Sequence, residues 1–532
     1  MRIVKPPSQM LNLILTLILV LPLAAACTSA DWAERADRDA EDVLAEKSVE
    51  FEEFRENDLV RPGMEPPEVE SEEIDLSDVP EVVGLEDAMK VATKRNRDYI
   101  TQKESLFLAA LALTTTRSDF SPVFSGTVSA LMTDSETTRR NDTARINFGV
   151  SQVLPTGGNV SVGVNGTKTG GDLEVFSDEN SSAGVTVDFN QPLLRDAGYE
   201  SSHESLTQGE RNVVYAIRDF ELYREDFTIT VATQFYNLVR QRREIVNAEQ
   251  DLESREFVMN QSAAKFEVGL ATEVDKLRAK RQYLSAQSGL LATKEAYDLS
   301  LDRFKIQLGL PTSFPLTIRS EEPEYSEVPV DLRKAVEAAL HNRVDLITSR
   351  DRVEDAERKL DISINRLLPD LDLDGSYRND TGDPTTIRNA VFGNYGWTLG
   401  ITLEIPLERT AERNAMRRRM IEFDQSRRSL TLAEDNVILQ VRDSYRSMRR
   451  TETSLELRRQ EIEAAKKEAE AAQIRFEAGE TDNLAVTDAQ TAVLSAENSY
   501  IRDLVSYEIA RIQLLRDVGI LFLDDHGMWR EP

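Results

Sequence analysis

The chain has 532 residues and a mass of 60.0 kDa, and its 94 acidic residues exceed its 64 basic residues, giving a formal net charge of -30. This charge argues against nucleic acid as a partner, because phosphates would repel so acidic a protein. With 3 histidines and 1 cysteine, a single chain can build neither a disulfide framework nor a Cys/His zinc site, so we expect no metal and no cofactor.

Residues 1–26 have the pattern of a signal peptide. Arg2 and Lys5 precede an apolar run that is shorter than the roughly 20 residues of a membrane-spanning helix. Small side chains then lead to Cys27, as in a bacterial lipobox. We expect cleavage before Cys27 and acylation of this residue, with an ordinary buried thiol as the alternative. Residues 27–84, rich in acids and proline, are expected to form a lipid-anchored tether.

The tether is expected to be mostly unstructured, with a possible helix from about Trp32 to Phe54. After Cys27 the sequence has no second run of 18 apolar residues. If the chain crosses a membrane, we therefore expect it to do so with strands.

Long helices are the dominant signal in the rest of the chain. An apolar residue recurs every seventh position, as at Ile245, Leu252, Met259 and Phe266, which is typical of coiled coils. Two helices of about 100 Å are expected at about 199–266 and 409–475. Four helices of about half that length are expected at about 85–120, 273–308, 332–366 and 483–518.

Short segments of strict apolar–polar alternation separate these helices, at about 123–192 and 371–405. Val160, Val162 and Val164, for example, alternate with small or polar residues. Their length suits strands that cross a bilayer at a tilt. A soluble β-sandwich with one solvent-exposed face is the alternative, but the lipidation signal and the nearby aromatic residues favour strands that lie in a membrane.

The chain contains two copies of one unit, 85–331 and 332–522, followed by a tail, 523–532. At one constant offset Leu85 aligns with Leu332 and Pro122 with Pro369. Later, Phe266-Glu-Val-Gly269 aligns with Phe476-Glu-Ala-Gly479, and each glycine is expected to reverse a helix into its neighbour. Four to six strands cannot close a membrane barrel, so several copies must pool their strands.

The two-copy plan, the Phe-Glu-x-Gly turns, Gln191–Arg195 (QPLLR) and Phe304–Leu310 (FKIQLGL) together resemble the TolC-type outer membrane efflux family over about residues 85–522. The resemblance implies an α+β membrane protein in which a homotrimer joins one transmembrane antiparallel β-barrel to a long coiled-coil α-helical barrel. It also implies partners, namely outer membrane lipid, a periplasmic adaptor protein and an inner-membrane pump. The family usually has four strands per chain. Either this chain contributes six, or the hairpin around Pro155–Gly158 folds elsewhere.

The resemblance also implies roles for residues at the two glycine turns. The turns match the family's adaptor-docking tips, formed here by Val268, Gly269, Leu270, Ala271, Ala478, Gly479, Glu480 and Thr481. Asp275 and Asp488 match its entrance aspartates. The family's other carboxylate falls on Ala485 and its basic residue on Thr481, so Glu480 and Asp482 are expected to compensate. For each acid, a solvated helix face is the alternative.

The sequence has no phosphate-binding glycine loop, no Gly-x-Ser-x-Gly and no His-Glu-x-x-His, so we expect no enzymatic activity. The expected function is a passive outer membrane exit duct of a tripartite efflux or type I secretion system. The alternative from another class is a lipid-anchored coiled-coil envelope scaffold without a pore, for which the bilayer-length strands would have no use.

Overall fold

The structure is a computed structural model that describes residues 29–48, 79–135, 138–170, 181–319, 325, 329–381, 395–524 and 527–529. The expected signal peptide and Cys27 lie outside these residues. The chain divides into two compact units. Unit 1 comprises Met1–Glu50, Leu106–Ala216 and Arg350–Ser429, and unit 2 comprises Phe51–Ser105, Ile217–Ser349 and Leu430–Pro532. Among the described residues, no helix has both the length and the apolar character needed to cross a membrane.

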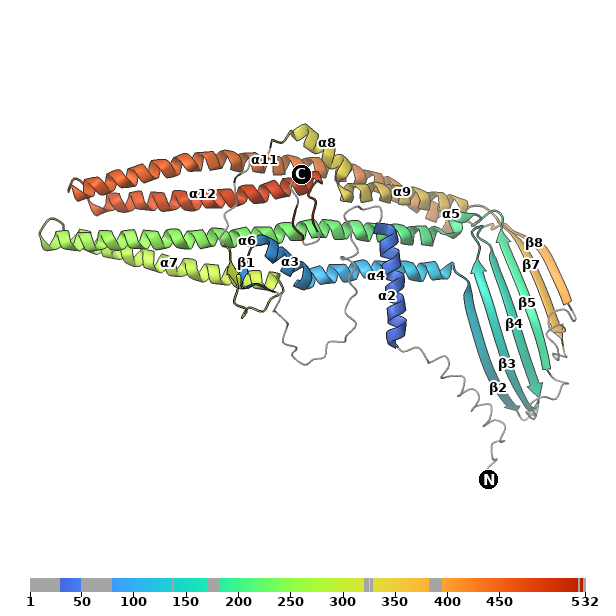
Figure 1. The fold of residues 1–532 in the computed structure, drawn as a ribbon. Helices are drawn as coiled ribbons and strands as arrows, with labels where there is room; N and C mark the ends of the chain where they lie inside the picture. Colours follow the sequence, from blue (N-terminus) through green and yellow to red (C-terminus); the bar gives the residue numbers. More distant parts are fainter. Residues whose placement is uncertain are drawn as a thin grey trace, which may run out of the picture. The chain divides into compact units, whose positions relative to one another are not determined.

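Unit 1 contains an antiparallel sheet with the strand order β2-β3-β4-β5-β7-β8 (Figure 1). Its six strands are β2 (Val123–Ser135), β3 (Thr138–Val153), β4 (Asn159–Gly170), β5 (Ser181–Pro192), β7 (Asp370–Thr381) and β8 (Tyr395–Glu404). The hairpin around Pro155–Gly158 joins β3 to β4 and is part of this sheet. Of the two alternatives, the structure therefore has six strands in one sheet, with β2 and β8 at its edges.

The two faces of the sheet differ sharply in polarity, as the strict alternation predicts. One cross-strand row is apolar in every strand and consists of Phe124, Val150, Val162, Val187, Tyr377 and Trp397. The next row, on the opposite face, includes Ser151, Ser161, Asp188, Ser376 and Thr398. On the apolar face Phe124 is 78% exposed and Trp397 is 70% exposed, so a single chain leaves this face uncovered.

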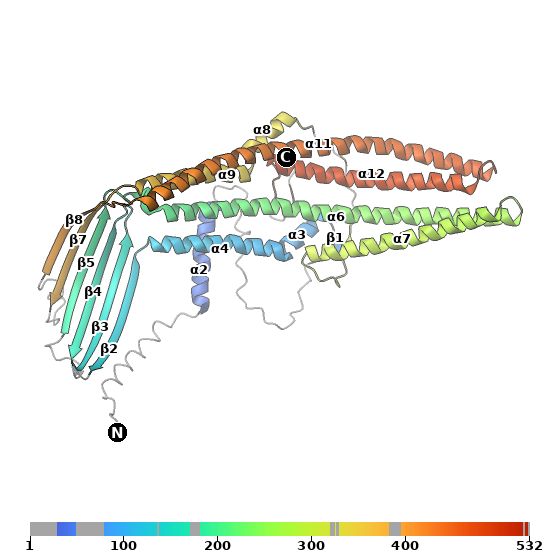
Figure 2. The same ribbon diagram turned by 180° about the vertical axis from the view of Figure 1, so that it is seen from behind.

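Two antiparallel helical hairpins follow the strands in the sequence (Figure 2). The first pairs α6 (Glu204–Glu267) with α7 (Glu273–Gln307), and the second pairs α11 (Thr410–Glu477) with α12 (Asn483–Val518). These bounds lie within a few residues of the expected ones, apart from the start of α6, which the short helix α5 (Tyr199–Ser202) precedes. The seven-residue repeat therefore located these helices correctly.

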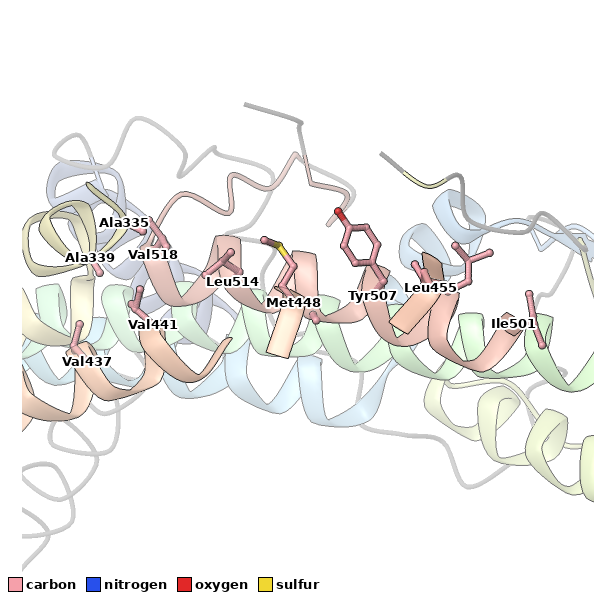
Figure 3. Packing of buried hydrophobic residues seen from close by; sticks show 12 residues of the cluster. Ala335, Ala339, Val437, Val441, Met448, Leu455, Ile501, Tyr507, Leu514 and Val518 are labelled. Carbon is pink, nitrogen blue, oxygen red and sulfur yellow. The ribbon is translucent and has the colours of Figure 1, made fainter. Parts of the chain in front are cut away.

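Within unit 2, a seam of buried apolar side chains joins three helices (Figure 3). Its members come from α8 (Leu332–Asn342), α11 and α12. They include Ala335, Ala339, Val437, Val441, Met448, Leu455, Ile501, Tyr507, Leu514 and Val518. Burying a side chain of this size contributes about 1.5–3 kcal/mol relative to leaving it exposed, so the seam fixes α12 against α11.

The expected continuous helices at about 85–120 and 332–366 are each broken, and this expectation was wrong. The first divides at Asn96 into α3 (Leu85–Arg95) and α4 (Arg97–Asp119), and the second divides at Arg343 into α8 and α9 (Val344–Asn365). Asn96 accepts a hydrogen bond from the Tyr99 amide at 2.8 Å and donates one to the Gln307 carbonyl at 2.7 Å. Its side chain therefore caps one helix while contacting another element.

The second break has a comparable cause. Arg343 adopts an extended conformation, and its guanidinium contacts Asp345 at 2.6 Å and the Gln440 side chain at 2.6 Å. Just before α3 in the sequence, β1 (Val82–Val83) pairs in parallel with β6 (Thr317–Ile318), which follows α7. The expected tether also holds a helix, α2 (Ser29–Ser48), where the sequence had indicated one from about residue 32 to residue 54.

Candidate functional site

The first hairpin tip is a tight glycine turn between α6 and α7. Gly269 has φ of 73°, a conformation that disfavours any residue with a Cβ atom. The Gly269 amide donates to the Phe266 carbonyl at 3.0 Å and the Leu270 amide to the Lys265 carbonyl at 2.7 Å, which is the Schellman pattern of a helix end. Val268 and Leu270 are 69% and 79% exposed. The turn thus presents two apolar side chains to the exterior, and Ala271 beside them is half-buried.

The second tip, between α11 and α12, repeats this geometry. Gly479 has φ of 76°, its amide donates to the Phe476 carbonyl at 3.1 Å, and the Glu480 amide donates to the Arg475 carbonyl at 2.9 Å. Here the residues on either side of the glycine are Ala478 and Glu480, both exposed, followed by the half-buried Thr481. The two tips therefore have the same backbone conformation but differ in their side chains, since those of the first tip are apolar and those of the second include an acid.

Polar contacts join the two hairpins just behind their tips. The side-chain amide nitrogen of Asn483 donates to the main-chain carbonyl of Asp275 at 2.8 Å and to the Ser262 hydroxyl at 3.3 Å. Lys265 donates from Nζ to the Phe476 carbonyl at 2.5 Å, and its ammonium lies 3.7 Å from the centre of the Phe476 ring. Asn483 is only 1% exposed, so breaking these contacts would leave polar groups without water.

Asp275, the first expected entrance acid, is engaged in capping α7. Its carboxylate accepts from the Thr272 amide at 3.1 Å and from the Thr272 hydroxyl at 2.6 Å, while its own amide donates back to that hydroxyl at 3.2 Å. This is a capping box. The hydrogen bonds from Thr272, followed by the charge of Arg278, lower the pKa of Asp275 from its usual value, so it is ionised at neutral pH.

Asp482 caps α12 and shares a cation with Asp275. Its carboxylate accepts from the Leu484 amide at 3.2 Å and the Ala485 amide at 3.3 Å. Arg278 lies 3.4 Å from Asp275 and 3.4 Å from Asp482, so one guanidinium bridges the starts of α7 and α12. Asp488 is different, because it is exposed on α12 and takes part in no ion pair within the described residues.

Sequence reasoning missed three residues of this site: Arg278, Lys265 and Asn483. Arg278 is one helical turn after Asp275, a spacing that could have indicated an ion pair. Asn483 follows the Asp482 cap and gives no sequence signal, because its partners Ser262 and Asp275 are remote in the chain. Such contacts depend on how the two hairpins pack.

A second candidate region lies on the polar face of the sheet. A hollow of about 660 Å³ crosses β3, β4, β5, β7 and β8 on this face. Within it Asp374 accepts hydrogen bonds from Asn190 at 2.9 Å and from Thr402 at 3.0 Å, and Asp188 is also among the lining residues. The polar face is thus the hollowed one, and it carries carboxylates rather than cations along this stretch.

Among the described residues, no group of three or more His, Cys, Asp and Glu side chains is arranged to hold a metal ion.

A family model described as "Outer membrane efflux protein" matches residues 114–309 and 335–519, which together make up more than half of the chain. The two matched segments fall in the two halves that the sequence repeat defines. No curated protein sequence matched the chain.

Solved structures with the same fold are outer membrane channels. The outer-membrane channel OprN is 16% identical, with a TM-score of 0.63 over 87% of this chain and 99% of OprN. VceC of Vibrio cholerae is 15% identical, with a TM-score of 0.61 over 82% of this chain and 96% of VceC. CmeC of Campylobacter jejuni is 15% identical, with a TM-score of 0.63 over 82% of this chain and 86% of CmeC. At these identities the likeness concerns the fold.

Proposed function

This chain belongs to the outer membrane efflux protein family, and on that premise we propose that it is the outer membrane exit duct of a tripartite efflux or type I secretion system. It would conduct substrates passively across the periplasm and the outer membrane and would carry out no catalysis. The resemblance seen in the sequence is confirmed by the family match. The observation that carries the proposal is one sheet with an apolar face and a polar face, in the same chain as two exposed glycine-turned hairpins.

The sheet supports a transmembrane barrel built from several copies. The apolar row from Phe124 to Trp397 would face lipid, and the hollow polar face would line the lumen. Six strands leave edges at β2 and β8, and unpaired backbone groups in lipid cost several kcal/mol each. Three copies would join β8 of one to β2 of the next. Three copies of this six-stranded sheet would form an 18-stranded barrel. Three chains with the family's usual four strands each would form a smaller barrel.

The helices of unit 2 support the same trimer. On α7 Leu277, Leu284 and Leu291 recur every seventh residue and are 57%, 50% and 63% exposed. On α11 Leu457, 22 residues before Gly479, lies level with Leu291, 22 residues after Gly269, and is 61% exposed. Apolar seams at heptad spacing are the pattern of coiled-coil contacts. We propose that α7 of one copy packs on α11 of the next, closing an α-helical barrel.

The tips would dock a periplasmic adaptor protein, which connects the duct to an inner-membrane pump. The exposed Val268 and Leu270 would provide the apolar contacts, with Gly269 holding the turn. The test is cross-linking of the adaptor in cells. Val268→Asp with Leu270→Asp should abolish both cross-linking and export while trimers still form, whereas Glu463→Lys, at an exposed polar position on the shaft of α11, should do neither. Normal export in the tip variant would refute the docking role.

The acids behind the tips would form the periplasmic gate. Repeated by threefold symmetry, Asp488, Asp275 and Asp482 would each become a ring of three charges, whose repulsion is relieved by widening or by cations. Arg278 already compensates two of these rings. Asp488 would therefore carry most of the uncompensated charge at the entrance.

The protein would also be anchored in the outer membrane through an acylated Cys27, ahead of α2 in the sequence. The anchor would assist insertion, and the barrel would hold the protein in the bilayer. Acyl labelling of wild type and Cys27→Ser tests the modification. Recovery of Cys27→Ser, exported with a replacement signal peptide, as a soluble monomer in the periplasm would refute the barrel.

A further inference from the structure

Helix α2 packs on α4 and α6 of unit 1 through its C-terminal half. Ala40, Val43 and Leu44 are buried, with exposures of 0%, 3% and 1%. At the same end Glu46 lies 2.9 Å from Arg117 of α4, and Lys47 lies 3.6 Å from Glu210 of α6. Arg117 and Glu210 are themselves 3.2 Å apart, so the two pairs form one network across α4 and α6.

In the N-terminal half of α2, most of the side chains that the structure describes are exposed. Trp32 is 57% exposed, and Glu34, Arg35, Arg38 and Asp39 are exposed as well. In Figures 1 and 2 α2 crosses α6 and α4, and its N-terminal half continues past α4 on the side away from α6. The 14 residues from Trp32 to Glu46 give α2 a length of about 21 Å. This length is about twice the distance between the axes of two packed helices.

The sheet indicates what lies past α4. Helix α4 leads into β2, one edge of the sheet, and α11 follows β8, the other edge. When copies join β8 to β2, the start of α11 from the next copy must come beside α4. This step rests on the trimer of the proposed function. Arg117 lies two residues before the end of α4, where the chain enters β2, and Arg417 lies seven residues after the start of α11, which follows β8. Both residues are therefore within about 10 Å of the helix end nearest the sheet.

The start of α11 complements α2 in charge and in polarity. Between Arg413 and Arg428 there are six arginines against two acids, in a protein whose net charge is -30. Arg413, Arg417 and Arg428 are exposed, and no ion pair within the described residues involves them. Ile421 lies one turn beyond Arg417 on the same face and is 44% exposed. By contrast α2 carries seven acids against three bases and an exposed tryptophan.

We propose that α2 is an inter-subunit strap, whose N-terminal half docks on the basic start of α11 of a second copy. Trp32 covers Ile421, and the acids of α2 face Arg417 and Arg428. Each subunit is thereby fastened to its neighbour outside the barrel and the coiled coil. Attraction of opposite charges sets the pairing of subunits, while the buried end of α2 keeps the strap attached to its own chain.

Cross-linking between two differently tagged copies, expressed together, tests the strap. One copy carries Trp32→Cys and the other Ile421→Cys, and a short bis-maleimide joins thiols that are close. The expected product carries both tags. In the matched control Leu439→Cys replaces Ile421→Cys. It is exposed on the same helix but about 27 Å farther along, so it should give no such product. A control without introduced cysteines, in which Cys27 is the one cysteine, measures any cross-linking through that thiol.

Charge reversal provides a second measurement. Arg417→Glu with Arg428→Glu should lower the yield of the two-tag product about fivefold, and Glu34→Arg with Asp39→Arg in the other copy should restore it. Intact trimers without the two-tag product would overturn the strap and leave the proposed duct standing. Absence of trimers altogether would overturn both. Quenching of Trp32 fluorescence by brominated phospholipids, in a Trp397→Phe and Trp529→Phe background, would instead assign this half of α2 to the membrane and also overturn the strap.

Discussion

Asn483, at the start of α12, donates a hydrogen bond to the main-chain carbonyl of Asp275, at the start of α7, over 2.8 Å. The same side chain contacts Ser262 of α6. One buried amide therefore ties the second hairpin to both helices of the first, directly behind the tips. Any movement that separates the two hairpins at this end must break these bonds.

We predict that Asn483→Ala loosens the tips without dissolving the fold. The substitution leaves the Asp275 carbonyl and the Ser262 hydroxyl without their donor, at a cost of about 1–3 kcal/mol. Hydrogen exchange of the amides around residues 270–276 should accelerate, and so should exchange at the start of α12. Asp488→Asn is the control, because this exposed side chain on the same helix forms no side-chain hydrogen bond or ion pair with the described part of the first hairpin. Unchanged exchange in Asn483→Ala would show that packing alone joins the hairpins.

The gate should depend more on Asp488 than on the other two acids. Three carboxylates on a narrow ring interact at about 1–4 kcal/mol for each close pair at an intermediate dielectric, and cations relieve that repulsion. Asp488→Asn should raise the resting conductance little but sharply weaken block by multivalent cations applied from the periplasmic side. Asp275→Asn should act in the same direction with a smaller effect, since Arg278 and Thr272 already compensate Asp275. Cation block that is unchanged in the double variant would refute the gate assignment.

Gly309 should tolerate no side chain. It has φ of 74°, and a Cβ atom there would lie 2.1 Å from the Arg95 carbonyl oxygen, where α3 gives way to α4. Gly309→Ala should therefore lower the free energy of unfolding by about 2–4 kcal/mol. The matched control is Gly289→Ala, in the middle of α7 with open space around it, which should raise stability by about 0.5–1 kcal/mol. Equal denaturation midpoints for the two variants would contradict this packing.

Glu225 should make stability fall as the pH rises. Burial is the main cause that raises the pKa of this carboxyl to about 8, with nearby Glu221 and Asp226 adding to the shift and Arg516 and Arg343 opposing it. Because the folded-state pKa exceeds the unfolded value, the stabilising contribution is complete below about pH 4.5 and is lost as the pH rises through 8. Between pH 5 and 9 the thermal midpoint of wild type should fall more than that of Glu225→Gln. Glu295→Gln, at an exposed position, should behave as wild type.

The β3–β4 hairpin should set the width of the barrel. Removing residues 138–170 deletes two adjacent antiparallel strands, so β2 can still pair with β5 in the correct direction. Four strands per chain then remain, and barrel diameter scales roughly with strand number. Polyethylene glycols that enter the wild-type channel from the barrel end should be excluded from the variant. An unchanged cut-off would show that these strands do not form part of the wall.

The sequence predicted the elements whose signal is periodic. The spacing of Ile245, Leu252 and Met259 located α6, and the alternation around Val162 located β4, because a single buried face dictates each pattern. The breaks at Asn96 and Arg343 were missed, since neither residue interrupts a helix as proline does and each is held by a partner far along the chain, Gln307 or Gln440.

The site was predicted in its glycine turns and acids but not in their connections. Gly269 and Gly479 stand out because few other residues adopt a positive φ. The capping role of Asp482 was visible in principle, as an Asp directly before a helix, but the bridge through Arg278 was not, because it joins residues about 200 positions apart. Pairings of that kind arise from packing between hairpins.

The central claim is that several copies of this chain enclose one membrane channel, and reconstitution into planar lipid bilayers tests it most directly. Protein extracted from outer membranes and purified as a trimer should give discrete conductance steps. These steps should grow when the tips are loosened by Asn483→Ala. Protein that is recovered as a monomer, or a trimer that inserts but conducts no current in either form, would contradict the account.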